Sequence, residues 1–383
     1  MRWFPVGLVV PVLVLLLTAR GLTLAQVGQV MAVYSVVTLL LELPTGGLAD
    51  GWGRRPVIVG SAVVQAAALA GLALASTQWH IVAAAAGLGA ARALSSGPVE
   101  AWFVDASHAL GNSDVESGLA RGQMSEALAL GGGAVIGGLL PNVGVLPATG
   151  SGLIGLSVPF LVASAMALAY AVVAWLLLTG DRASGSGVGR TVGTAAKVAF
   201  GQAPVRRLMV VAVCLGVILS GVELISPDRV SQLVGSAGSA SAIFGVLTAS
   251  AFVVSAGGAW LSTRIPGRRV WVGAMAYLVI GVLALGLALP VLGVAALTYL
   301  GVYLCIGVQG PVTASLLHAR IESGVRSTVM SVESLALQAG GAVASIMVGW
   351  AVTNLGLVSG LGILSMAAVV GSLTLVYDLR HVS

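Results

Sequence analysis

Apolar stretches without a formal charge make up most of this chain, and short polar connections separate them. No Asp, Glu, Lys or Arg occurs within the segments 21–41, 56–91, 127–180, 230–263, 270–319 and 334–377. A helix that spans a bilayer needs about 20 predominantly apolar residues, so the longer segments hold two helices each. Including helices with an isolated charge, the pattern predicts twelve spanning helices, at about 3–19, 23–47, 56–76, 79–104, 120–141, 155–179, 207–227, 239–263, 270–289, 292–317, 327–352 and 356–377.

The composition agrees with an all-α integral membrane protein whose surroundings are the lipid bilayer. Of the 383 residues, 58% are hydrophobic and 8% are charged, and the mean hydropathy is +1.04. A soluble domain carries about 25% charged residues. A transmembrane β-barrel would show alternating segments of about ten residues, and this pattern does not occur in the sequence.

The basic residues are distributed as the membrane predicts, so we expect no nucleic-acid partner despite an isoelectric point near 9.7. With the N-terminus inside, nearly all Arg and Lys residues fall on the cytoplasmic side. Only Arg20 and Arg229 fall outside, and Arg92 lies within a helix. The positive-inside rule therefore predicts a multi-pass protein of the cytoplasmic membrane with both termini in the cytoplasm.

A polar, basic and Gly/Ser-rich connection at 180–207 lies near the middle of the chain. We interpret it as a cytoplasmic linker between an N-terminal bundle, 1–179, and a C-terminal bundle, 208–383. The sequence ESGLARGQMS at 116–125 resembles ESGVRSTVMS at 322–331, and a Gly-Pro pair recurs at 97–98 and 310–311. Two parallel-repeat bundles of six helices are a transporter architecture, with the substrate held near the midplane.

The stretch GGLADGWGRR at 46–55 resembles the signature of the major facilitator superfamily, Gly-x-x-x-Asp-Arg/Lys-x-Gly-Arg-Arg/Lys, in the loop between helices two and three. Gly51 departs from the pattern, where a base is usual. The stretch WLSTRIPGRR at 260–269 is a decayed copy in the second half, with Arg264 at the position of the acid. The matching positions, which we treat as a gating motif, are Gly46, Asp50, Gly53, Arg54 and Arg55.

This resemblance implies a latch that exists only while the cytoplasmic side is closed. Asp50 would be stabilised by the N-terminal dipole of helix eleven, which is predicted to begin near Ser327. Arg54 would pair with Asp105 at the cytoplasmic end of helix four. A contact present in one of two states biases the equilibrium between them.

Two weaker motifs point to one branch of the superfamily. RALSSGPVEAWFVD at 92–105 resembles the intramembrane Arg of helix four followed by Gly and Asp. GAVIGG at 133–138 resembles the antiporter motif Gly-Pro-x-x-Gly-Gly, with Ala134 in place of Pro. The chain is therefore similar to bacterial drug-efflux-like members.

Charges inside predicted spans are the candidates for substrate or proton coupling, because a charged group there is costly and usually functional. We predict Arg92 and Glu223 as a pair across the central cavity, with Glu100 as the alternative acid. Glu42 belongs either to the gate or to the coupling site. The acids that we expect in the first turns of helices five and eleven, with a structural role, are Glu126 and Glu333.

The leading functional prediction is a secondary active transporter, a monomer, that exports a small, partly apolar molecule in exchange for protons. The alternative is an importer or uniporter of a sugar, peptide or other metabolite. An integral-membrane enzyme would need clustered catalytic or metal-binding side chains, and the sequence shows no such spacing. We therefore predict no cofactor, no metal and no enzymatic activity.

Overall fold

A computed structural model of the chain describes residues 2–96, 99, 102–103, 106–107, 115–147, 153–178, 201–265, 269–318, 320 and 326–379. This part of the chain is α-helical and contains no β-strand. The first-half helices are α1 (Phe4–Val9), α2 (Leu13–Ala19), α3 (Leu24–Trp52), α4 (Arg54–Leu74), α5 (Gln78–Ser95), α7 (Val115–Leu139) and α8 (Val158–Leu177), with 3-10 helices η1 (Leu140–Val143) and η2 (Gly155–Ser157). The second-half helices are α10 (Ala203–Val234), α11 (Ala237–Ser262), α12 (Arg269–Gly286), α13 (Leu292–His318), α14 (Arg326–Leu355) and α15 (Leu357–Leu379).

The predicted fold class is confirmed. Ten helices of the described residues are long and apolar enough to cross a membrane: α3, α4, α7, α8 and α10 to α15. The two other predicted spans coincide with the α1–α2 pair and with α5. The chain is therefore a multi-pass helical membrane protein.

The first predicted helix, 3–19, is not continuous, and this boundary was wrong. It breaks between Val9 and Leu13, where Val12 donates only to the Val9 carbonyl, at 3.1 Å. Pro11 explains the break, because proline lacks an N–H and its ring clashes with the carbonyl four residues earlier.

Four further boundaries differ from the prediction. The predicted helix 79–104 is interrupted at Ser96, which is extended at φ −71° and ψ 126°, although Val99 is again helical. Helices α7 and α14 begin before the positions predicted for them, so Glu126 and Glu333 do not lie in first turns. The end of the predicted linker 180–207 forms the start of α10, and most of the linker lies outside the described residues.

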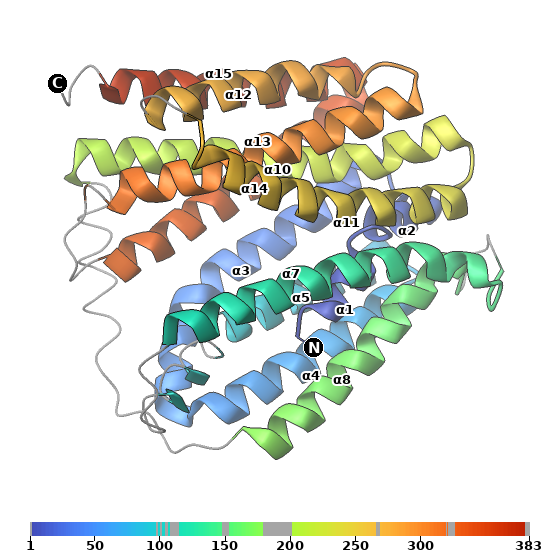
Figure 1. Ribbon diagram of the computed structural model, residues 1–383. Helices are drawn as coiled ribbons and strands as arrows, with labels where there is room; N and C mark the ends of the chain where they lie inside the picture. The colour runs from blue at the N-terminus through green and yellow to red at the C-terminus, as the bar shows by residue number, and fades with distance from the viewer. Residues whose placement is uncertain are drawn as a thin grey trace. The chain divides into compact units, whose positions relative to one another are not determined.

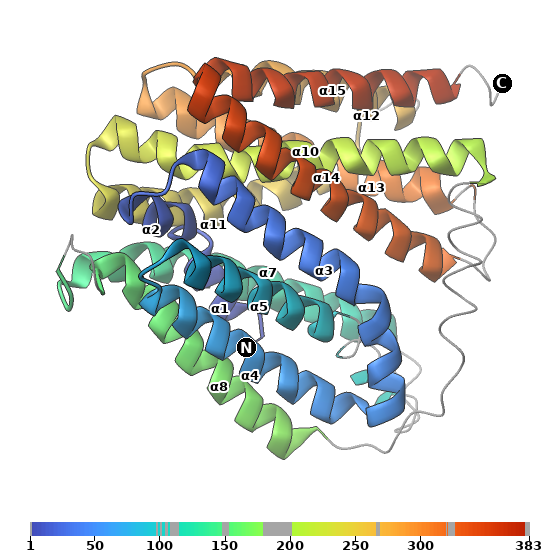
Figure 2. The ribbon, with the colours of Figure 1, turned by 180° about the vertical axis from the view of Figure 1, so that it is seen from behind.

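The described chain divides into two compact units. Unit 1 comprises 1–16, 33–188 and 241–246, and unit 2 comprises 17–32, 189–240 and 247–383. Figures 1 and 2 show the helices of each unit from opposite sides. The domain boundaries at 179/180 and 207/208 stay predictions.

The packing inside the two units repeats. In unit 1 the pairs α4–α8, α4–α5, α1–α7 and α1–α8 are in contact. In unit 2 the corresponding pairs are α12–α15, α12–α13, α10–α14 and α10–α15. Glycines bring the paired helices close: a methyl group at Gly137 of α7 would overlap the Leu8 backbone of α1. One at Gly340 of α14 would overlap the Val213 carbonyl of α10. Such small-residue contacts are typical of helix packing in membranes.

Candidate functional site

The gating motif lies at a helix–helix junction rather than in a loop. Helix α3 continues through Gly46 and Asp50 to Trp52, and α4 begins at Arg54. The whole turn is made by Gly53, whose φ of +91° is readily adopted only by glycine. The sequence prediction of a loop was therefore wrong, although the need for glycine at this position follows from the same motif.

Arg55 connects the start of α4 to the end of α8 within unit 1. Its guanidinium carbon lies 4.2 Å from the centroid of the Trp175 ring, and its Nη2 donates a hydrogen bond to the Trp175 carbonyl. A cation near the C-terminus of a helix complements the helix dipole. Arg55 thus holds two helix ends together at the face predicted to be cytoplasmic.

The partners proposed for the latch are only partly described. Asp50 and Gly46 lie on the last turns of α3, but the Asp50 side chain lies outside the described set, as do Asp105 and Glu100 altogether. Arg54 is partly exposed at the first position of α4. The latch and the Glu100 alternative therefore stay predictions.

Arg92 lies in the last turn of α5, and its surroundings in unit 1 are aromatic and polar. The guanidinium carbon of Arg92 is 4.5 Å from the centroid of the Trp3 ring, and that of Arg2 is 4.9 Å from the same centroid. Arg2 also donates to the Ser95 hydroxyl at 3.2 Å. Two cations share one indole, an arrangement in which the negative face of the ring offsets positive charge.

Glu42 of α3 belongs to the same cluster. Arg92 lies near enough to its carboxyl group to act on it electrostatically. Its Oε2 is buried and accepts no hydrogen bond from a described residue. Arg92 is therefore near a carboxyl group of unit 1, although the two side chains form no ion pair within the described residues. The predicted pairing of Arg92 with Glu223 joins residues of different units and stays a prediction.

Glu223 of α10 lies in a different environment, in unit 2. The Tyr303 hydroxyl of α13 donates to its Oε1 at 3.1 Å. The Tyr299 and Tyr303 rings pack together with centroids 4.9 Å apart and planes tilted by 45°, and both side chains are buried. Thr248 of α11 lies near the Tyr299 hydroxyl without forming a hydrogen bond of good geometry. No arginine or lysine among the described residues acts on Glu223.

The sequence predicted Glu42, Arg92 and Glu223 as site residues but not their neighbours. Trp3, Arg2, Tyr299 and Tyr303 were not among the predicted site residues. The sequence signal for the second cluster was the spacing of Tyr299 and Tyr303, which lie one helical turn apart. Among the described residues, no group of His, Cys, Asp and Glu could hold a metal ion.

Fold and clusters together define a multi-pass helical membrane protein with repeated units and partly buried acidic residues in its helices. A family model described as Major Facilitator Superfamily matches residues 1–345. The chain belongs to this superfamily, and its fold is that of a transporter rather than of an enzyme.

Solved transporter structures share this fold. The nucleoside transporter NupG is 14% identical with a TM-score of 0.79, over 99% of this chain and 96% of that one. A mutant of the peptide transporter POT is 15% identical with a TM-score of 0.75, over 99% and 92%. A bacterial homologue of the human lysosomal transporter Spinster is 16% identical with a TM-score of 0.70, over 99% and 94%. At these identities the likeness shows the fold alone. Comparison with curated protein sequences found no match.

Proposed function

We propose that the protein is a proton-coupled exporter of a small, partly apolar molecule in the cytoplasmic membrane. It works by alternating access, as a monomer with both termini in the cytoplasm. Superfamily membership supports transport in general, and the Ala/Val/Leu/Gly-rich helices favour an apolar substrate. The observation that carries proton coupling is the environment of Glu223.

Glu223 lies in a spanning helix with one described hydrogen-bond donor and no described cation. A carboxylate in such a place is costly unless it is paired or protonated. A proton that binds while access is open to one side neutralises the group. Hydration on the other side then favours the charged form. This cycle converts a proton gradient into a conformational preference.

Glu42 differs because Arg92 acts on its charge, whereas no described cation acts on Glu223. We propose that the Arg92–Glu42 pair, together with Trp3, stabilises unit 1 and positions the end of α5. The residues beyond that end include Glu100, the alternative coupling acid, which the cluster would help to orient. Under this proposal Glu42 is not the proton carrier.

We also propose that the junction of α3 and α4 forms the latch implied by the superfamily motif. Asp50 on the final turn of α3 is separated from the start of α4 by only three residues. With Gly53 as the whole turn and Arg55 fixed on Trp175, this end of α3 is tied to α4 and α8. A rigid support of this kind suits Asp50, because the latch contact must form when the cytoplasmic side closes and break when it opens.

The test is gradient-driven transport in liposomes of the full-length protein. Candidate compounds come from a screen of toxic and secreted molecules against cells lacking the protein. Glu223→Gln should abolish accumulation driven by an imposed pH gradient yet preserve exchange at zero gradient. Glu42→Gln, the matched control, should keep gradient-driven accumulation. Intact coupling in Glu223→Gln contradicts the proposal, and exchange without any response to pH in the parent protein indicates a uniporter.

A further inference from the structure

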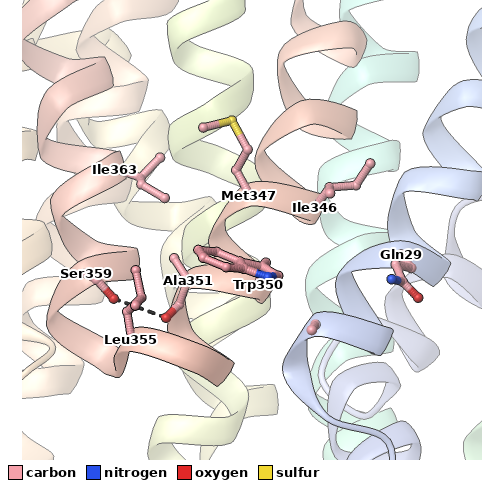
Figure 3. Close-up of a pocket in the computed structure, with 9 residues that line it drawn as sticks. Gln29, Ile346, Met347, Trp350, Ala351, Leu355, Ser359 and Ile363 are labelled. Carbon is pink, nitrogen blue, oxygen red and sulfur yellow. Dashed lines mark hydrogen bonds between the residues drawn. The ribbon is translucent and has the colours of Figure 1, made fainter.

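A groove of about 370 Å³ lies within unit 2, between the start of α3, the end of α14 and the start of α15. Its walls include the apolar residues Ile346, Met347, Leu355 and Ile363 and the indole of Trp350. Figure 3 shows these side chains around one space, with Gln29 of α3 on the opposite wall. Ile346, Met347, Trp350 and Leu355 are about half exposed or more. In a spanning protein, such a surface faces the bilayer.

The helix lengths place this groove at the boundary between hydrocarbon and headgroups. Helix α14 has 30 residues and is about 45 Å long, which matches a bilayer including its headgroup layers. Trp350 is five residues before the end of α14, and Gln29 is five residues after the start of α3. Each therefore lies about 7 Å below a helix end, near the edge of the hydrocarbon core. Ile346 lies about 6 Å deeper.

Two polar groups point into this otherwise apolar groove. Figure 3 shows the indole nitrogen of Trp350 on the side of the ring toward α3, which carries Gln29. Within the described residues, neither side chain makes a hydrogen bond, and both are exposed. Ser359 differs, because its hydroxyl donates to backbone carbonyls of α14 and of the following turn. An unpaired N–H at the hydrocarbon edge favours an occupant that supplies an acceptor there.

We propose that the groove binds one glycerophospholipid of the adjacent leaflet, the outer leaflet in the predicted topology. Its acyl chain lies along Ile346, Met347 and Ile363. An ester carbonyl oxygen accepts hydrogen bonds from the Trp350 indole N–H and the Gln29 amide N–H. A phospholipid fits because the groove continues the bilayer-facing surface, and because its ester groups lie at the depth of the two donors.

The experiment uses the full-length protein in lipid nanodiscs that contain phosphatidylethanolamine with a diazirine near the ester end of one acyl chain. Illumination should label the α14 segment 346–350 more strongly than the bilayer-facing residues of α12. Gln29→Leu and Trp350→Phe should each lower that labelling about threefold, because each removes one donor. Trp271→Phe is the matched control: Trp271 is 50% exposed on α12, outside the groove, and its loss should change nothing.

Two further arms separate hydrogen bonding from simple contact. An ether-linked analogue of the same probe, which lacks the ester carbonyls, should label the segment about threefold less. Ile363→Trp, which fills the groove and leaves both donors in place, should reduce labelling by the ester probe as well. The proposal is overturned if α12 and α14 are labelled equally. It is also overturned if the ester probe labels all three groove variants as strongly as the parent protein.

Discussion

Glu42 in unit 1 and Glu223 in unit 2 are both acids of spanning helices, but their neighbours differ. Glu42 is within electrostatic range of Arg92, whose guanidinium is stacked on Trp3. Glu223 receives a hydrogen bond from Tyr303 and has no cationic neighbour among the described residues. A carboxylate with a fixed cation can stay charged throughout a cycle, whereas one with only a neutral donor needs a proton or water. From this contrast we infer that Glu42 contributes to the stability of unit 1 and that Glu223 couples transport to protons.

Among variants that test this difference between the two acids, the largest effect should come from removing Arg92. Arg92→Met removes the cation that acts on the half-buried Glu42 carboxylate, so we expect a loss of about 1–3 kcal/mol in the stability of unit 1. Tryptophan fluorescence during thermal unfolding measures it. Adding Glu42→Gln to Arg92→Met should restore part of the loss, because the two residues are coupled.

The control for Arg92 is another stacked arginine without a described acid beside it. Arg264 lies 4.3 Å from the Trp260 ring centroid and is exposed. Arg264→Met should change stability by less than about 0.5 kcal/mol. If both arginine variants lose the same stability, the Glu42–Arg92 contact is not what distinguishes unit 1.

A second effect, of similar size, concerns an acid at a helix end. Asp50→Asn should preserve folding and membrane insertion but weaken the latch by about 1.5–3 kcal/mol, which shifts the equilibrium between the two states roughly tenfold or more and slows transport. Asp228→Asn is the matched control, because within the described residues Asp228 accepts one hydrogen bond, from Gln232 on its own helix at 2.7 Å. Transport at the parent rate in Asp50→Asn protein would contradict the proposed latch.

The smallest effect should come from the neutral donor beside Glu223. Tyr303→Phe removes the hydroxyl that stabilises the charged carboxyl, so proton release becomes less favourable and coupled transport slows about three- to tenfold. Tyr277→Phe removes a hydroxyl that is equally buried but donates to the Val211 carbonyl, at 2.7 Å. That control should lower stability and leave the pH dependence of transport unchanged. A shifted pH profile in both variants would mean that Tyr303 has no special role.

The fold was predictable because span length and charge-free segments are strong signals in a membrane protein. The breaks inside helices were harder, as the two Gly-Pro pairs illustrate. Helix α13 continues through Pro311, and the preceding Gln309 donates to the Gly273 carbonyl of α12 at 2.6 Å. At the equivalent position of unit 1, the Ser96 hydroxyl turns back to the Ala93 carbonyl at 2.9 Å, and α5 ends. The helix that continues through its Gly-Pro pair, α13, is thus the one in which the preceding side chain is long enough to bond the next helix.

The candidate sites were predictable only in part, because their neighbours come from distant sequence. Arg55 and Trp175 are 120 residues apart, and Trp3 meets Arg92 only after folding. No local pattern in the sequence indicates such stacking. The charged members were found because a charge in a spanning helix stands out, whereas an aromatic ring there does not.

The claim that Glu223 carries the coupling proton is tested most directly without a substrate, by infrared difference spectroscopy. The purified protein in lipid membranes is taken through a change of pH, and the C=O stretching band of protonated carboxyl groups is recorded. The account predicts a pH-dependent band that disappears in Glu223→Gln and persists in Glu42→Gln. A band that survives in Glu223→Gln and disappears in Glu42→Gln would contradict it.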